Sequence, residues 1–259
     1  YDRRLLSGEA EAELAPVEIH EVDPLLEQWD GERMPTHVLL EYLELLGRTA
    51  ASHYATATDL YKQLEDMKDG GVYALSIPKA PYRCPPGPYE RACLVANYLQ
   101  KTKPKSKVLV LDANEEITSK KGLFTKAFEK YKGILEYRPN SELREVDAAS
   151  RTAVLEFDKV KADVLNVVPP QRAGDIAAKS GLKLINNRWV DVNWLSFEAT
   201  STPGVHVIGD AIFPAPTMPK SGHMANQHGK VAAAAVIQLL KGEPVNAAPA
   251  MTNTCYSFV

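Results

Sequence analysis

The stretch Gly71-Val72-Tyr73-Ala74-Leu75-Ser76-Ile77-Pro78, followed shortly by Tyr82-Arg83-Cys84-Pro85-Pro86-Gly87-Pro88-Tyr89-Glu90, decides the fold. The first part is an apolar run of strand length, and a helical pattern over 89–100 follows it. A βαβ unit of the dinucleotide-binding kind carries its glycine fingerprint at this strand-to-helix turn. Here a cysteine, prolines and a glutamate replace the glycines. We interpret the turn as rebuilt for thiol chemistry rather than for holding a pyrophosphate.

A second strand is predicted over 107–112, and it ends in Asp112, where a nicotinamide-binding fold has its ribose-binding acid. Pro85, Pro86 and Pro88 nevertheless have no N–H group, and a pyrophosphate needs such donors at the helix start. The sequence therefore predicts that the α/β fold is kept and the nucleotide site is lost.

Flanking segments complete a mixed α/β pattern. Residues 1–70 are acidic and helix-prone, and they predict connecting helices, among them 36–46 and 54–67. Further strands are expected at 152–157, 162–168, 188–192 and 205–208, and further helices at 118–132, 172–180 and 223–241.

The expected strand 205–208 ends in Gly209-Asp210, and a proline-rich loop then leads to Lys220, Ser221 and Gly222 at the start of an alanine-rich helix. The carboxylate of Asp210 can accept a hydrogen bond from a sugar-like hydroxyl. The helix start supplies N–H donors and partial positive charge, which would stabilise an anionic reduced isoalloxazine. A plain strand–turn–helix is the alternative, but the combination of motifs favours a flavin site.

The chemistry of the cysteines stays open at this level. A helix start and the neighbouring Arg83 favour a reactive thiolate at Cys84, although free cysteine is also common as a small buried residue. Glu90 could transfer protons if it is buried, or it could simply serve the helix dipole. Cys93 lies within the helix and is expected to pack in the core. Cys255 could pair with Cys84, but the sequence spacing alone does not show it.

Composition narrows the class of protein. The chain has 259 residues, which is enough for one large domain or two smaller ones. Its formal net charge of −3 gives no argument for nucleic acid or an anionic membrane as a partner. No apolar run approaches the roughly 20 residues of a membrane span. The three cysteines and six histidines show no metal-binding spacing, so we expect no metal site. The chain begins at Tyr1, without a leader pattern.

These motifs together resemble the flavoprotein subunit of flavocytochrome c sulfide dehydrogenase, within the superfamily of FAD- and NAD-linked disulfide reductases. The resemblance runs in order from about residue 60 to the end, whereas residues 1–55 match poorly. The segments that carry it are Lys62–Met67, Arg83–Arg91, Ser106–Val108, Pro169–Gly174, His206–Asp210, Met218–Gly222, Gly229–Ala235 and Asn253–Ser257.

The resemblance implies a fold like that of glutathione reductase, an α/β fold built of Rossmann-type domains. The implied parts are a helical connecting region (1–70), an inserted NAD-like domain with the cysteine loop (71–145), a second portion of the FAD domain (146–242) and the start of a C-terminal interface domain (243–259). The family's N-terminal segment with the FAD fingerprint is missing, so we expect an interior portion of a longer protein.

The resemblance also implies the site. Cys84 and Cys255 would form the redox disulfide over the flavin, and Glu90 would be the nearby candidate for proton transfer. Asp210 would bind the ribityl chain of FAD. The remaining expected cofactor-binding residues are Gly209, Pro170 and, facing the pyrimidine side of the flavin, Lys220, Ser221 and Gly222.

The implied activity is the periplasmic oxidation of sulfide, with electrons passing from FAD to a c-type cytochrome subunit that carries the haem. One alternative is an enzyme like sulfide:quinone oxidoreductase, although such an enzyme should have an amphipathic membrane-binding tail and none is visible. The other is a non-catalytic fragment that only binds the haem subunit.

Overall fold

The computed structural model describes residues 59–257 and residue 259, which all belong to one unit, Thr58–Val259. The helix expected over 36–46 lies outside the described residues. Of the helix expected over 54–67, the described part is helical as far as Asp66. In the described part of the chain, no helix is both long and apolar enough to cross a membrane.

A four-stranded parallel sheet forms the centre of the first half of this unit. Its strands are β1 (Val72–Ile77), β2 (Lys107–Asp112), β3 (Leu135–Arg138) and β7 (Val164–Val167), in the spatial order β3-β2-β1-β7. All three pairings are parallel. The strands β1 and β2 read as continuous apolar runs because a parallel sheet is covered on both faces. The predicted fold class is therefore confirmed.

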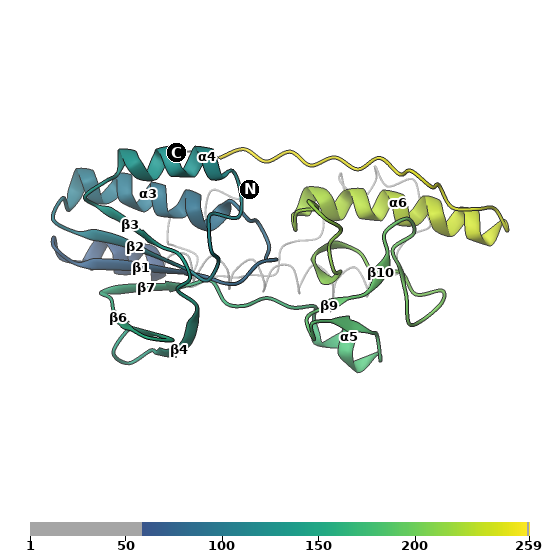
Figure 1. Cartoon of the computed structure of the whole chain (residues 1–259), viewed down its shortest axis with the longest axis horizontal. Helices are drawn as coiled ribbons and strands as arrows, with labels where there is room; N and C mark the ends of the chain where they lie inside the picture. Colours follow the sequence, from purple (N-terminus) through teal and green to yellow (C-terminus); the bar gives the residue numbers. More distant parts are fainter. Residues whose placement is uncertain (1–58, 258) are drawn as a thin grey trace, which may run out of the picture. The chain divides into compact units, whose positions relative to one another are not determined.

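Each face of the sheet has its own cover. Helices α3 (Gly87–Thr102) and α4 (Lys121–Lys130) lie over one face, as Figure 1 shows. There Tyr89 and Phe124 pack with buried strand residues in the largest apolar cluster. The opposite face carries a small antiparallel sheet in which β5 lies between β4 and β6, and a second cluster fills the space between the sheets. These three strands are β4 (Leu143–Asp147), β5 (Thr152–Leu155) and β6 (Lys159–Lys161).

The strand β7 lies next to β1, although 87 positions of chain, with α3, α4 and five strands, separate their ends (164 − 77). The antiparallel strands β4 to β6 are inserted before the last parallel strand returns to pair with β1. Residue 145, near which a domain boundary is expected, lies in β4, and the boundary stays a prediction.

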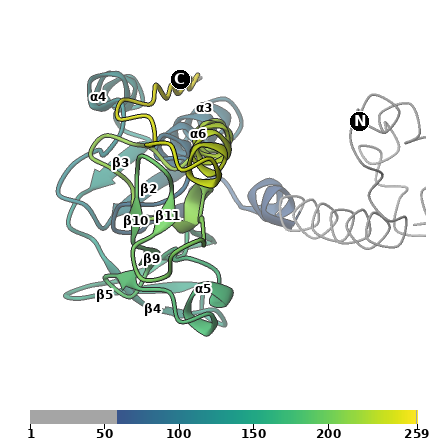
Figure 2. The same cartoon turned by 90° about the vertical axis from the view of Figure 1, so that its right-hand side faces the viewer.

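The second half of the unit is built of short elements around one long helix. Val190, Phe197, Ile212 and Ala232 are among the buried residues of its apolar cluster. Figure 2 shows α6 beside the β10–β11 pair. The elements are α5 (Asp175–Lys179), β8 (Leu184–Ile185), β9 (Trp189–Val190), β10 (Val192–Asn193), β11 (Glu198–Ala199), the 3-10 turn η4 (Gly209–Ala211) and α6 (Gly222–Leu240).

One strand prediction is wrong. Residues 205–208 form no strand but a single antiparallel bridge between His206 and Glu198. The N–H of Val205 is used in a turn, where it donates to the carbonyl of Thr202, so only Val207 donates across to Phe197. The strand expected over 188–192 is divided into β9 and β10, because the intervening Asp191 N–H donates to Lys183. Strands β3, β4, β6, β8 and β11 were not predicted.

Candidate active site

Cys84 lies in the loop between β1 and α3, with an exposed thiol. Its backbone φ is 54°, in the left-handed region that non-glycine residues adopt at a cost. Its N–H donates to the carbonyl of Lys220 at 2.8 Å, and its own carbonyl accepts from the N–H of Gly87 at 2.9 Å. A Cβ on Gly87 would lie 3.0 Å from the Cys84 sulfur. The turn thus holds the thiol against the start of α3, where a Cβ at position 87 would force the sulfur to shift.

The start of α3 has few donors to offer a phosphate. Pro86 is its N-cap, Pro88 has no N–H, and the N–H of Gly87 is already bonded to Cys84. The N–H of Glu90 donates to the carbonyl of Pro86 within the helix. This arrangement agrees with the interpretation that the glycine-rich phosphate turn has been replaced.

Asp112, at the position where a nicotinamide-binding fold has its ribose-binding acid, is fully buried, and its carboxylate is hydrogen-bonded within the chain. Its carboxylate accepts from Tyr89 Oη at 2.7 Å and from Tyr137 Oη at 2.9 Å. It also accepts from the backbone N–H and the side-chain amide of Asn114, at 3.0 and 2.7 Å. Burial raises the pKa of both tyrosines, so their hydroxyls stay protonated and donate. A ribose has no access to this carboxylate without displacing those groups.

A network of hydroxyl groups connects Asp112 with the cysteine loop. Tyr82 Oη lies 2.9 Å from Thr118 Oγ1 and 3.3 Å from the carbonyl of Pro85, the residue after Cys84. The N–H of Thr118 donates to Tyr89 Oη at 3.1 Å. The side chains of Tyr82, Tyr89 and Thr118 therefore connect the cysteine loop with the buried carboxylate of Asp112.

Lys220 is 4% exposed, and its ammonium group is engaged inside the protein. Nζ donates to the carbonyl oxygens of Asp210 at 2.8 Å and Ile212 at 2.6 Å, and it lies 3.7 Å from the ring centre of Trp189. Burial lowers the pKa of Lys220 to about 8, the charge of Asp210 opposes this, and Arg188 lowers it further. Lys220 thereby holds the η4 turn with its side chain and the cysteine loop with its carbonyl.

One carboxylate oxygen of Asp210 has no hydrogen-bond partner among the residues that the structure describes. Its Oδ2 lies 3.4 Å from Arg83 Nε, whereas Oδ1 is buried without a hydrogen bond in the described structure. The preceding Gly209 has φ +73° and donates its N–H to His228 Nδ1 at 3.1 Å. A buried carboxylate oxygen needs a donor, and a hydroxyl of a flavin's ribityl chain fits that need.

The start of α6 also fits a flavin. Gly222 has open space where a Cβ would stand, so a planar ring can approach the backbone closely. The helix has 19 residues, and its N-terminal partial charge favours an anionic group. The sequence-predicted residues Gly209, Asp210 and Gly222 are therefore compatible with this cofactor. The ammonium group of Lys220 instead lies inside the protein, where it donates to the backbone of the η4 turn.

The segment with Cys255 is attached to the start of α6. Ser221 Oγ caps the helix by accepting from the N–H of Met224, and it donates to Asn253 Oδ1 at 2.6 Å. The N–H of Thr254 donates to His223 Nδ1 at 3.1 Å. The hydroxyl of Ser221 thus positions this segment.

Lys120 holds the same segment from the other side. Its Nζ donates to the carbonyl of Cys255 at 2.7 Å and contacts Ser257 Oγ at 3.0 Å. Cys84 and Cys255 are both exposed free thiols, and the predicted disulfide is not formed in this structure.

Two short stretches therefore contact both cysteine segments. Residues 220–223 bind Cys84 through the carbonyl of Lys220, and they bind residues 253–254 through Ser221 and His223. Residues 118–120 bind the Cys84 loop through Tyr82 and bind Cys255 through Lys120. Nothing in the sequence spacing points to Thr118 or Lys120 as part of the site. Asn253, in contrast, lies in the segment Asn253–Ser257, which the sequence analysis had already singled out.

The other predicted site residues lie around this centre. Glu90 is half-buried in the first turn of α3, and its charge adds to the effect of burial, which raises the pKa of Cys93 to about 11. Cys93 is 1% exposed, as expected for a packing residue. Pro170 is exposed, and the side chain of its neighbour Gln171 accepts from the N–H of Arg83 at 2.7 Å.

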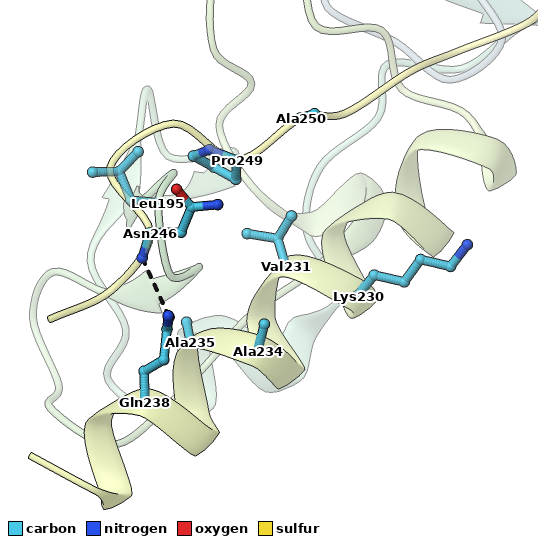
Figure 3. A pocket seen from close by; sticks show the side chains of 9 residues that line it. All are labelled: Leu195, Lys230, Val231, Ala234, Ala235, Gln238, Asn246, Pro249 and Ala250. Atoms are coloured by element: carbon cyan, nitrogen blue, oxygen red, sulfur yellow. Dashed lines mark hydrogen bonds between the residues drawn. The ribbon is translucent and has the colours of Figure 1, made fainter. Parts of the chain in front are cut away.

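A separate hollow of about 180 Å³ lies between α6 and residues 246–250, and Figure 3 shows it. Val231, Ala235 and Pro249 are among the residues that line it. These α6 residues follow Gly222 by nine and thirteen positions (231 − 222 and 235 − 222). The hollow is thus on the order of 13–20 Å along the helix from its start, at about 1.5 Å per residue.

The Rossmann-type parallel sheet, with its strand–helix turn at Cys84, has the fold of the FAD- and NAD-linked disulfide reductases. Residues 57–169 match the family model described as the central part of the flavoprotein chain of sulfide dehydrogenase (flavocytochrome c). Over this segment, which is less than half of the chain, the protein is similar to that family of flavoproteins.

Several solved structures align with part of this chain. A chain of the mitochondrial ATP synthase of Tetrahymena thermophila aligns with a TM-score of 0.57 and 21% identity, over 72% of this chain and 47% of that chain. A pyridine nucleotide-disulfide family oxidoreductase from Enterococcus faecalis V583 aligns with 0.49 and 14%, over 66% and 39%. An NAD-dependent persulfide reductase from A. fulgidus aligns with 0.47 and 16%, over 72% and 33%. The chain spans less than half the length of each of these structures.

Proposed function

We propose that this chain is part of a sulfide dehydrogenase flavoprotein, which oxidises sulfide through Cys84, Cys255 and FAD and passes electrons to a c-type cytochrome in the periplasm. The observation that carries the proposal is the attachment of both cysteine segments to the same two stretches, 118–120 and 220–223. The family of residues 57–169 supports it.

The proposed reaction starts from the oxidised pair. A hydrosulfide ion attacks one sulfur of the Cys84–Cys255 disulfide, so the S–S bond breaks, a persulfide forms on one cysteine and a thiolate is left on the other. A second hydrosulfide takes the outer sulfur of the persulfide, which leaves two cysteine sulfurs reduced and releases a hydrogen disulfide ion and a proton. The sum is two hydrosulfide ions converted to one hydrogen disulfide ion, one proton and two electrons.

FAD, when bound, would supply the acceptor for the two electrons as the disulfide closes again. Asp210 Oδ1 would accept a hydrogen bond from its ribityl chain, and the start of α6 would face its pyrimidine side. Lys220 would keep the η4 turn in place from inside the protein. We propose Glu90, half-buried in the first turn of α3, as the group that takes up the proton.

The test is the variant Cys84→Ser in the complete flavoprotein with its cytochrome subunit. Sulfide-dependent reduction of the cytochrome should be abolished, because the pair can no longer form. The matched control is Cys93→Ser, which changes a buried cysteine of the same region and should leave turnover in place. Undiminished turnover in the Cys84 variant would contradict the proposal.

An absorption spectrum separates the alternatives. Flavin bands that bleach with sulfide support the enzyme, and transfer to a quinone rather than to a cytochrome would favour the enzyme of the quinone type. A colourless complete protein would favour a role in binding the haem subunit only.

A further inference from the structure

Lys120 contacts the Cys255 segment but takes no part in the proposed reaction. It is the N-cap of α4 and has a φ of 49°, a left-handed conformation that residues other than glycine adopt at a cost in free energy. Its side chain is exposed, so no need to fill the core explains the conformation. What the side chain does is donate to the carbonyl of Cys255 and contact Ser257.

Thr118, two residues before Lys120, is hydrogen-bonded to tyrosines on either side of Cys84 in the sequence. Thr118 contacts Tyr82 through its hydroxyl and Tyr89 through its N–H, and both tyrosines are buried beneath the Cys84 loop. Lys120 therefore extends from a segment that is hydrogen-bonded to buried tyrosines, and its ammonium group contacts the Cys255 segment. Holding two reacting groups on one base raises their effective concentration, because less freedom is lost when they react.

We propose that Lys120 is a positioning residue that holds the Cys255 segment where its thiol can pair with Cys84. This role rests on the proposed function of the two cysteines. It concerns disulfide closure alone, in which two thiols lose two electrons and two protons as the S–S bond forms.

The experiment uses the complete protein with its cysteines reduced and diamide as oxidant, which takes up both electrons and both protons. The rate of Cys84–Cys255 disulfide formation is measured by peptide mass spectrometry. Lys120→Met should slow closure about tenfold, since two hydrogen bonds to the segment are lost. Lys120→Arg keeps a donor of similar reach and should restore most of the rate.

The matched control is Lys121→Met. Lys121 is the next residue, is also exposed and pairs with Glu116, so its loss should leave the closure rate unchanged. Hydrogen exchange of residues 253–257 gives a readout independent of redox chemistry, and it should become faster in Lys120→Met but not in the control.

The outcomes separate the two ideas. Equal closure rates and equal exchange in Lys120→Met and the wild type would overturn the role of Lys120. If the wild type forms no Cys84–Cys255 disulfide while exchange still becomes faster in Lys120→Met, the anchor is real and the proposed function fails. Slowed closure together with faster exchange is the expected result.

Discussion

The backbone N–H of Cys84 donates to the backbone carbonyl of Lys220 across 136 positions of sequence (220 − 84), at 2.8 Å. This bond connects the strand–helix turn of the parallel sheet with the start of α6. The side chain of the same lysine supports the turn that presents Asp210. Lys220 therefore contacts the Cys84 loop through its backbone carbonyl and the η4 turn through its ammonium group. A substitution of its side chain should remove the second contact and keep the first.

Lys220→Met should lower the free energy of unfolding by about 1–3 kcal/mol, because the carbonyls of Asp210 and Ile212 lose a buried donor. Urea unfolding followed by circular dichroism measures the change. The exposed Lys126→Met is the control and should change little. Equal stability of both variants would show that the buried ammonium contributes nothing net.

The pH dependence of stability should carry the signature of Lys220. Its pKa is lowered to about 8 in the folded protein from 10.5, so the unfolded chain binds the proton more tightly between these two values. Stability therefore gains a favourable contribution as pH rises from about 8 to 10.5, and this contribution is absent below pH 8. The difference between wild type and Lys220→Met, measured by urea unfolding at several pH values, should grow over this window.

Gly87→Ala should disturb the thiol of Cys84 without disturbing the helix. The new methyl would stand 3.0 Å from the sulfur, so the cysteine side chain must move, whereas alanine is a good helix former. The rate of Cys84 alkylation by iodoacetamide should change several-fold. Gly122→Ala in α4 meets nothing within 4 Å and serves as the control. An unchanged alkylation rate would show that the sulfur has room on another side.

Asp210→Asn should weaken flavin retention in the complete protein. The amide group puts a donor where the ribityl hydroxyl needs an acceptor, and a hydrogen bond to a charged group contributes about 1.5–3 kcal/mol, or roughly ten- to a hundredfold in affinity. Flavin release after dilution or gel filtration measures it. Asp66→Asn changes an exposed carboxylate elsewhere and should retain flavin like the wild type.

Tyr137→Phe should destabilise the first half of the unit by about 1–3 kcal/mol, because the buried carboxylate of Asp112 loses a donor at 2.9 Å. Thermal or urea unfolding reports the change. Tyr256→Phe removes a hydroxyl from an 81% exposed side chain and should have no effect. A neutral Tyr137 variant would indicate that the remaining donors of Asp112 suffice.

Local sequence pattern predicted the buried elements well and the exposed ones poorly. Strands β1 and β2 and helices α3 and α6 follow from apolar runs and helical spacing, since burial imposes such patterns. Strand β4 exposes most of its side chains, so it has no apolar face to reveal it. Residues 205–208 look like a strand, yet their partners in the chain supply only one bridge.

The candidate site was predictable to the extent that residue types announce their chemistry. Asp210 and Gly222 stood out because they belong to a combination of motifs that favours a flavin site, whereas the role of Cys84 stayed open until the family resemblance was considered. The inward direction of the Lys220 ammonium group and the contact of Lys120 with Cys255 depend on contacts between distant segments. No single-sequence pattern encodes such contacts.

The saturated carboxylate of Asp112 has a consequence for protein engineering. Restoring glycines in the turn at 84–88 would return N–H donors to the start of α3, but it would not recreate a coenzyme pocket. The hydroxyls of Tyr89 and Tyr137 would still donate to the Asp112 carboxylate, and the side chain of Tyr82 would still be buried beneath the turn. To make NADH the reductant, these tyrosines would have to be replaced first. Their replacement would also remove the hydrogen bonds that support the cysteine loop.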